Sequence, residues 1–493
     1  MDKIKNKVKE IFCTKELYVF FAITILFFGA FCRLQYAPDT YSVFTNGLRH
    51  TVLHFLSCGR FVTGAATYFA MRICHLGNEG TYVLSYSFAI ICTVISLYKL
   101  NKLIKKDIKN DIISIIISTL IIINPFSIEL FMYIEKGIMV LSVLLCVLAV
   151  EQIDKFFNGN KKSIWLTLIF MIISNCCYQG TVGLFVAISL IYIIKYSKNI
   201  KEFIVNNVVV ALVYGIPAAI NFLAVRFLFT NARVNGKIII SEAISKMIDG
   251  TKSMIVNTYN LLPKYLFMIA IIILLGIIIY KAIKQKGSIK EKTLQIAGAF
   301  YLIAGTLFST VAPQILQDTS SIWFVARSSY PMAAIIGILT LYLFMKFDIN
   351  KIMKNVIIIL LIIFLMIQFS NFMRYIIDNY IGNYMDKAIT LQISNMIQEY
   401  EERTENKIDK ISIYQDASKQ YVYPNLKASG DMNIKAYAAD WCISRILKLY
   451  TGRELEVIES EESKKEEFLQ KNWDYFSKEQ IIFEDNVMHL CVF

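Results

Sequence analysis

The sequence predicts an α-helical protein that crosses a membrane many times and ends in a small α/β domain. Of the 493 residues, 56% are hydrophobic and only 18% are charged. The apolar residues gather in runs nearly free of charge, such as 113–123, 269–280 and 356–369. Runs that approach 20 apolar residues are typical of membrane-spanning helices. This composition excludes a disordered chain, a collagen and a disulfide scaffold, and it argues against an ordinary soluble enzyme.

The apolar runs predict about eleven spans. The first span follows a lysine-rich start that lacks the signature of a cleaved secretory signal, so we expect the protein to retain it. The fifth and sixth spans are short and adjacent, so the count can differ by one or two. The expected spans lie near residues 17–33, 81–99, 111–127, 137–151, 163–175, 178–195, 207–229, 264–281, 294–311, 329–346 and 355–374.

The distribution of lysines predicts the orientation of these spans. With the N-terminus in the cytoplasm, every inner segment carries three or more lysines, the bias that cytoplasmic loops show. The net charge is +13, yet residues 375–493 hold 14 Lys and Arg against 21 Asp and Glu. The basic excess therefore lies between the spans and indicates membrane orientation rather than nucleic-acid binding. The inner segments are 1–16, 99–110, 151–162, 195–206, 281–293 and 346–354.

The arginines follow a different pattern from the lysines. On this topology all eleven arginines lie on the outer side or at outer span ends. The planar guanidinium group binds phosphate or carboxylate through two parallel hydrogen bonds, so the pattern predicts anion binding outside the cytoplasm. The alternative is that these arginines are ordinary surface residues. The candidates for binding an anionic phosphate are Arg33, Arg49, Arg60, Arg233 and Arg327.

The first outer segment offers a candidate catalytic carboxylate. Asp39 follows Pro38 in a turn just beyond the first span. A carboxylate at the membrane surface beside arginines can act as a general base while the arginines neutralise a phosphate leaving group. The alternative is a solvated turn residue.

The second outer segment carries two acids in an otherwise apolar stretch. Glu129 and Glu135 stand at membrane level, with Tyr133 between them. Carboxylates at this depth usually face a cavity or a partner, so we expect these residues to contact substrate. A simple pairing of Glu135 with Lys136 is the structural alternative.

Two further outer segments carry polar and aromatic side chains. Tyr178 and Gln179 lie in a short turn, where they can bind sugar hydroxyls or cap helix ends. Trp323 precedes Arg327, and an aromatic ring beside polar groups suits sugar stacking, although tryptophan is also common at membrane interfaces.

Taken in order, these outer motifs resemble the GtrII-type glucosyltransferases, membrane enzymes of the GT-C class. The resemblance covers roughly residues 17–375 in pattern. It rests on an acidic first-loop motif followed by Gly-Arg, an Asn-Pro-Phe…Glu…Tyr segment and a Tyr-Gln turn. The matching residues here are Asp39, Gly59, Arg60, Asn124, Pro125, Phe126, Glu129, Tyr133, Tyr178 and Gln179. Family members often show paired acids in the first loop, whereas here Pro38 precedes Asp39.

The resemblance implies a GT-C-like fold and a polyprenyl-phosphate sugar as donor. A hexose, glucose for example, would pass with inversion to an envelope glycan outside the cytoplasmic membrane of a bacterium. Asp39 would match the catalytic base, Arg60 and the other outer arginines would bind the lipid phosphate, and Glu129 and Glu135 would orient hydroxyl groups. No cofactor is implied, and the resemblance leaves open whether a divalent metal is required.

The chain divides into an expected membrane domain, 1–375, and an expected extracytoplasmic α/β domain, 376–493. Within the latter, 410–414 and 455–458 read as strands and 436–450 as a helix.

Two other functions compete with the glycosyltransferase. One is a flippase or transporter of lipid-linked sugar, which would favour internal repeats and polar groups at the bilayer midplane. The other is a polysaccharide polymerase or ligase, which typically centres its chemistry on a large late outer loop.

Overall fold

The computed structural model describes residues 14–229, 239–315, 318–415, 421–430, 432–471 and 476–492. The chain divides into two compact units, which we call the membrane unit (Met1–Cys32 with Val52–Met373) and the tail unit (Arg33–Thr51 with Arg374–Phe493). The division expected near residue 375 differs in one respect, because Arg33–Thr51 belongs to the tail unit. Within that unit the Tyr36 N–H donates to the side-chain oxygen of Asn383 at 2.8 Å.

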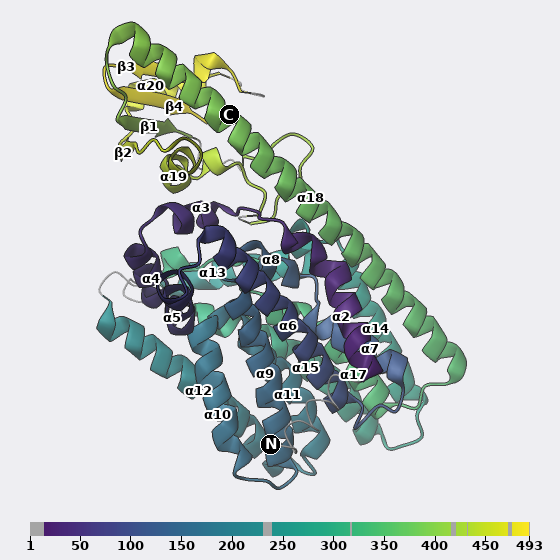
Figure 1. Cartoon of the computed structure of the whole chain (residues 1–493). Helices are drawn as coiled ribbons and strands as arrows, with labels where there is room; N and C mark the ends of the chain where they lie inside the picture. Colours follow the sequence, from purple (N-terminus) through teal and green to yellow (C-terminus); the bar gives the residue numbers. More distant parts are fainter. Residues whose placement is uncertain are drawn as a thin grey trace. The chain divides into compact units, whose positions relative to one another are not determined.

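The membrane unit is that of an α-helical, multi-pass membrane protein (Figure 1). Among the described residues, eight helices are long and apolar enough to cross a membrane, and three apolar helices are shorter. Every expected span coincides with a helix of one of these groups. The long helices are α2 with η1 (Lys15–Cys32), α6 (Asn78–Ile104), α9 (Lys136–Phe157), η3 with α11 (Gln179–Tyr196), α12 (Ile200–Leu228), α14 (Leu266–Lys284), α15 (Ile289–Ile315) and α18 (Lys351–Thr404). The shorter ones are α7 (Asp111–Ile122), α10 (Ser163–Cys177) and α17 (Ile335–Lys346).

Short helices connect these long ones. Several begin where the sequence supplies a turn residue; α3, for example, begins at Pro38, whose fixed φ angle suits the first helical position. The connecting elements are α3 (Pro38–Thr45), α4 (Leu48–Ser57), α5 (Phe61–Tyr68), η2 (Phe69–Ile73), α8 (Ser127–Met132), α13 (Ile240–Lys252), η4 (Ser253–Asn257), η5 (Thr258–Asn260), η6 (Thr319–Ser321) and α16 (Tyr330–Ala333).

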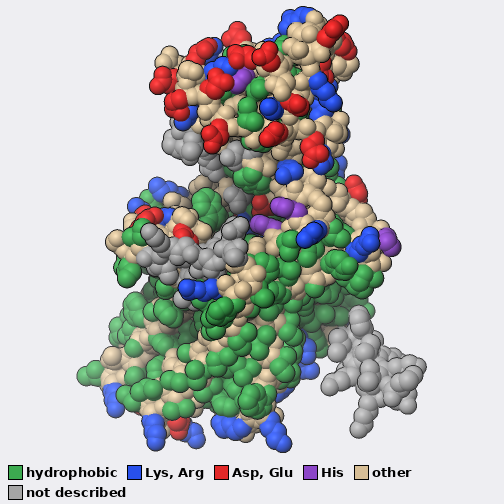
Figure 2. Space-filling view, turned by 90° about the vertical axis from the view of Figure 1, so that its left-hand side faces the viewer, with side chains coloured by type: hydrophobic (Ala, Val, Ile, Leu, Met, Phe, Trp, Pro, Cys, Tyr) green, Lys and Arg blue, Asp and Glu red, His purple; other side chains and the backbone are tan. Residues whose placement is uncertain are grey.

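The long helices differ in how deeply they are buried. Helices α9 and α11 are buried over most of their length, whereas in α2, α12, α14 and α18 only 28% of the apolar span is buried. Figure 2 shows one face of the molecule, on which exposed apolar side chains form a broad green surface. An apolar surface of this extent is what a helix bundle presents to lipid.

Ion pairs gather four of the segments expected on the inner side. They join residues from the start of α2, the end of α6, the end of α9 and the end of α11, so these four ends lie together. The pairs are Lys105 with Glu16, Lys106 with Asp154 at 2.7 Å and Lys195 with Asp107 at 2.7 Å.

The tail unit contains a four-stranded sheet in the order β2-β1-β4-β3. Strand β1 runs parallel to β2 and β4, and β3 is antiparallel to β4. The strands expected at 410–414 and 455–458 are present, and the expected helix 436–450 is split into η7 and α19. The elements are β1 (Lys410–Tyr414), η7 (Ala436–Ala438), α19 (Asp440–Thr451), β2 (Glu456–Ile458), α20 (Glu462–Leu469), η8 (Lys478–Gln480), β3 (Ile481–Glu484) and β4 (Val487–Cys491).

The alternation of side chains along β1 builds two apolar clusters in the tail unit. Ile411 and Ile413 face a core that also contains apolar residues of α18 and α19. Tyr414 belongs to a smaller cluster with Phe468 of α20. Successive side chains of a strand point to opposite faces, so helices cover both faces of the sheet.

Candidate functional site

A cavity of about 320 Å³ lies in the membrane unit. Four of the expected site residues line it, namely Arg60, Tyr178, Gln179 and Arg327. Trp323 lines it as well. The structure therefore brings together the Gly-Arg motif, the Tyr-Gln turn and the 312–328 segment, which are far apart in sequence.

The acids reach this site from one short segment between α7 and α9. The amide group of Asn124 donates to the carbonyl oxygens of Ile121 (3.1 Å) and Tyr330 (3.2 Å), which fixes the turn after α7. Ser127 donates its hydroxyl to the Asn124 carbonyl oxygen at 2.7 Å at the start of α8. The turn buries α8 completely and carries Glu129 into the protein interior.

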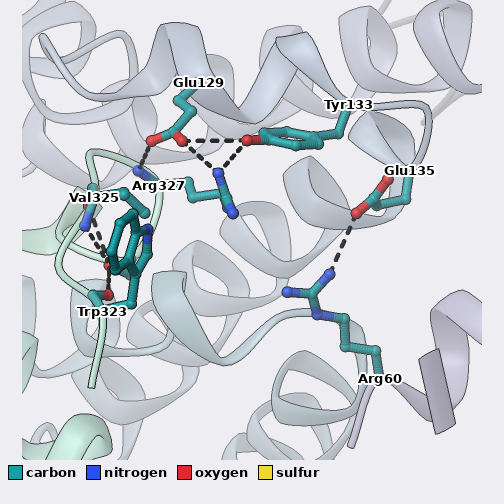
Figure 3. A network of polar contacts seen from close by, with 8 residues as sticks. Arg60, Glu129, Tyr133, Glu135, Trp323, Val325 and Arg327 are labelled. Atoms are coloured by element: carbon teal, nitrogen blue, oxygen red, sulfur yellow. Dashed lines mark hydrogen bonds and ion pairs between the residues drawn. The ribbon is translucent and has the colours of Figure 1, made fainter. Parts of the chain in front are cut away.

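Glu129 holds the backbone and the side chain of Arg327 (Figure 3). The Arg327 N–H donates to one carboxylate oxygen at 2.6 Å, and the guanidinium group donates to the other and to the Tyr133 hydroxyl. The guanidinium carbon lies 4.3 Å from the centre of the Tyr133 ring. The side chain of Glu129 is 1% exposed and that of Arg327 12%. Buried charges need partners of this kind, because an unpaired one is costly.

Arg60 makes fewer contacts, and it makes them with the other acid of the same segment. One guanidinium nitrogen lies 3.2 Å from a Glu135 carboxylate oxygen, and the guanidinium carbon lies 4.9 Å from the centre of the Tyr178 ring. The buried Nε atom of Arg60 has no hydrogen-bond partner among the described residues. The side chains of Arg60 and Glu135 are 18% and 7% exposed. This guanidinium group therefore has fewer protein partners than that of Arg327, and its residue lines the cavity.

A glycine and two amides set the position of Arg60. Gly59 has φ +74°, and a Cβ atom there would lie 2.4 Å from the side-chain oxygen of Asn221. The Asn221 amide donates to the Gly59 carbonyl oxygen at 2.8 Å, and the Gln179 amide donates to the same oxygen at 3.0 Å. The amide of Gln179, an expected sugar contact, thus holds the backbone before Arg60. Asn221 was not among the expected residues; its place inside an apolar span was the available signal.

Gly180 lets the two arginine-bearing segments approach each other. A Cβ atom at Gly180 would lie 2.7 Å from the Tyr178 ring and 2.8 Å from the Arg327 carbonyl oxygen. Any side chain there would push Arg327 away from the turn that carries Tyr178. The glycine of the Tyr-Gln-Gly turn therefore serves close packing.

The remainder of the cavity is mainly apolar. Gly215, Ala218 and Ala219 of α12 line it, together with Ala312 and Pro313 of α15. These small side chains leave a space between the two helices within the apolar part of the bundle. The cavity thus joins two guanidinium groups to an apolar space, an arrangement suited to an anionic head on an apolar chain.

The remaining acids and Tyr133 contact the arginines rather than the cavity. Glu129, Tyr133 and Glu135 do not line the cavity within the described residues; each lies against an arginine that does. Among the described residues, Glu135 forms its ion pair with Arg60, and none with Lys136 is found. The Lys136 ammonium group instead lies 3.5 Å from the centre of the Tyr82 ring, and it has no hydrogen-bond partner in the described part of the chain.

Three expected residues belong to the tail unit. Asp39 is exposed in the first turn of α3, and Arg49 is exposed in α4. Arg33 donates to the Tyr380 hydroxyl at 2.8 Å and lies over the same ring. Arg233 lies outside the described residues.

One group in the tail unit has ligand atoms close enough to hold a metal ion. Glu461, Glu484 and His489 form this group among the described residues. The Lys464 ammonium group contacts all three, at 3.3 Å from Glu461 and 3.2 Å from His489. This ammonium group holds the pKa of Glu484 below its usual value, and burial lowers the pKa of His489. A lysine thus already supplies the positive charge that a metal would bring.

Comparison with known proteins identified no relative of this chain. No family model, no curated protein and no solved structure matches the chain. The assignment of function therefore depends on the residues of the site.

Proposed function

We propose that this protein is a membrane glycosyltransferase that moves a sugar, glucose or another hexose, from a polyprenyl-phosphate donor to an envelope glycan. The observation that carries the proposal is the cavity in which Arg60 and Arg327 adjoin an apolar space between α12 and α15. A lipid phosphate has the matching chemistry, an anion at the end of an apolar chain. The GtrII-like order of the outer motifs supports the same proposal.

Arg60 is the proposed contact to the donor phosphate. It lines the cavity, makes one ion pair at 3.2 Å and keeps its Nε donor without a partner in the described chain. Because the Arg60 side chain lines the cavity, a phosphate held there can accept hydrogen bonds from its guanidinium group, which suits oxyanions. Developing charge on the leaving phosphate would thereby be stabilised in the transition state.

Arg327 is proposed to position the site rather than to take up the phosphate alone. Glu129 and Tyr133 already accept from its side chain, and Glu129 accepts from its backbone. Its positive charge still adds to the field at the cavity. Its loop also presents the Trp323 ring, which suits stacking on a sugar.

The apolar space is proposed to hold the first isoprenoid units of the donor. Small residues recur at Gly215, Ala218 and Ala219, so one face of α12 stays open towards α15. An isoprenoid chain entering between the helices would remove apolar surface from water at the mouth of the cavity.

Asp39 remains the proposed general base. Its carboxylate is exposed in the first turn of α3. It would take the proton of the acceptor hydroxyl as that oxygen attacks the anomeric carbon. The bond from the anomeric carbon to the phosphate oxygen then breaks, and the lipid phosphate leaves with inversion at the sugar.

The proposal includes a location and a topology. We place the protein in the cytoplasmic membrane of a bacterium, with all eleven apolar helices crossing and the N-terminus inside. The tail unit would then lie outside, where it can contact the acceptor glycan. The lysine-rich segments that the ion pairs gather at one end of the bundle are consistent with this orientation.

The test is transfer of radiolabelled hexose from its polyprenyl phosphate to isolated envelope glycan. Membranes would carry wild type, Arg60→Ala or the control Arg226→Ala, an exposed arginine on α12. We expect transfer by wild type and the control, and a loss of about 10²-fold or more in Arg60→Ala. Movement of labelled lipid across vesicles without any transfer would overturn the proposal in favour of a flippase.

A further inference from the structure

Helix α13 divides its surface into three sectors. Ala243 and Gly250 are buried, and Lys246 lies partly buried on the same side. Ile240, Ile244 and Ile248 follow at intervals of four, so they form one stripe. They are 72%, 52% and 63% exposed.

The third sector is polar. Ser241, Ser245, Asp249 and Lys252 are exposed and follow the isoleucine stripe around the helix. A helix in water would not keep three large apolar side chains this exposed beside a polar sector. This division is typical of helices that lie in the plane of a membrane interface, with their apolar side buried roughly 5–10 Å deep.

The spanning helices α12 and α15 also expose large apolar side chains. Phe227 and Leu228, at the end of α12, are also strongly exposed, as is Phe308 of α15. Helix α13 packs in part against α15. The lipid that surrounds the spanning helices can therefore also cover this stripe.

The buried sector of α13 holds the loop that carries Arg327. The Ile239 N–H, just before the helix, donates to the Thr319 hydroxyl at 2.7 Å, and Lys246 donates to the Thr319 carbonyl oxygen at 2.8 Å. A Cβ atom at Gly250 would lie 2.4 Å from the Phe324 ring, so this ring packs directly on the helix backbone.

The segment after α13 is also tied to this loop, and its backbone is strained. Thr258, Tyr259 and Asn260 have φ of +47°, +51° and +64°, the left-handed region that non-glycine residues rarely occupy. The hydroxyls of Tyr259 and Ser329 are 2.8 Å apart. Such strain persists only where the surroundings enforce it, and it gathers at functional sites.

We infer that α13 binds the surface of the lipid bilayer through Ile240, Ile244 and Ile248 and fixes the loop that carries Arg327 to that surface. The partner is the boundary between lipid headgroups and hydrocarbon. Lipid contact with α13 thereby stabilises the arrangement of the site, whatever reaction the site performs.

The first test measures the depth of α13 with nitroxide labels on the full protein in nanodiscs. Labels would replace Ile244 and, as the matched control one position on, Ser245, in a background without the accessible cysteines. We expect oxygen to relax the label at 244 more strongly, and an aqueous nickel chelate to relax the label at 245. The pair Ile248→Cys and Asp249→Cys repeats the test if one variant fails to fold. Equal access of the nickel chelate to both labels would overturn the inference.

The second test measures whether α13 holds the loop. Lys246→Ala removes the bond to Thr319, and Lys252→Ala, in the exposed polar sector, is the control. We expect deuterium uptake of residues 318–329 in nanodiscs to rise about twofold or more in Lys246→Ala alone, the loss expected for one hydrogen bond. Unchanged uptake would contradict the coupling. Neither test depends on sugar transfer, so either can fail while the proposed function stands.

Discussion

The two arginine–carboxylate pairs of the site differ in how completely the protein uses their hydrogen-bonding groups. Glu129 accepts from the backbone and side chain of Arg327, and Tyr133 takes a further bond. Arg60 makes a single ion pair with Glu135 and keeps a buried nitrogen without a partner in the described chain. A carboxylate that uses both oxygens on one arginine holds the fold together, whereas an arginine with one ion pair at the cavity wall is able to bind a ligand. The difference teaches that two arginines with the same expected role can serve separate purposes.

The largest effect is expected from Glu129→Ala. It leaves the Arg327 guanidinium buried without its carboxylate, and breaking a buried pair in this way costs about 3–5 kcal/mol. We expect a marked fall in the thermal unfolding midpoint of the purified protein in detergent. A midpoint like that of wild type would break the comparison, because the saturated pair would then contribute little to stability.

Arg60→Ala is expected to act on the reaction instead. Loss of one donor to the developing phosphate charge costs about 10²–10³-fold in rate. The unfolding midpoint should fall less than in Glu129→Ala, since Glu135 loses one bond from Arg60, whereas Arg327 loses the bonds of both its backbone and its side chain to Glu129. Rates of hexose transfer at saturating donor check this prediction, and a fall in stability matching that of Glu129→Ala would contradict it.

Gly59→Ala tests whether the backbone at Gly59 positions Arg60. The left-handed φ of +74° and the 2.4 Å approach of Asn221 leave no room for a Cβ atom. We expect a loss of about 1–3 kcal/mol of stability together with reduced transfer, because Arg60 shifts with the backbone. Gly276→Ala is the matched control, since a Cβ atom there meets nothing within 4 Å. Equal effects of the two substitutions would show that Gly59 does not position Arg60.

Glu135→Gln is expected to have the smallest effect. The glutamine keeps the shape and one acceptor oxygen, so the loss of stability should be about 1 kcal/mol, the difference between a hydrogen bond to a charged acceptor and one to a neutral acceptor. Arg60 would then compete less with an internal carboxylate, and the KM for the lipid donor should fall. A rise in KM would instead indicate that Glu135 contacts the substrate directly.

The spans and strands could be predicted because their signals are local. Each expected span coincides with an apolar helix, because a long apolar run such as 356–369 is unfavourable in water and typical of a membrane-spanning helix. The strand 410–414 likewise matches its expected bounds. The grouping of Arg33–Thr51 with the tail unit could not be predicted, because it depends on contacts such as that of Tyr36 with Asn383.

The candidate site could be predicted by residue type but not by pairing. Outer arginines and membrane-level acids were expected to be functional, and Arg60, Arg327, Glu129 and Glu135 do gather in one unit. Which acid meets which arginine depends on the turn at Asn124 and on the close approach at Gly180. Neither the role of Gln179 in holding Gly59 nor the aromatic contact of Lys136 has a signal in the order of residues.

The most direct test of the division between the two pairs is thermal unfolding with and without added polyprenyl phosphate. Wild type, Arg60→Ala and Arg327→Ala would be compared in the same detergent. A ligand that binds the folded state raises its unfolding midpoint. We expect the lipid to raise the midpoint of wild type but not of Arg60→Ala, and we expect Arg327→Ala to unfold early even without lipid. Stabilisation of Arg60→Ala equal to that of wild type, or an unchanged midpoint in Arg327→Ala, would contradict the account.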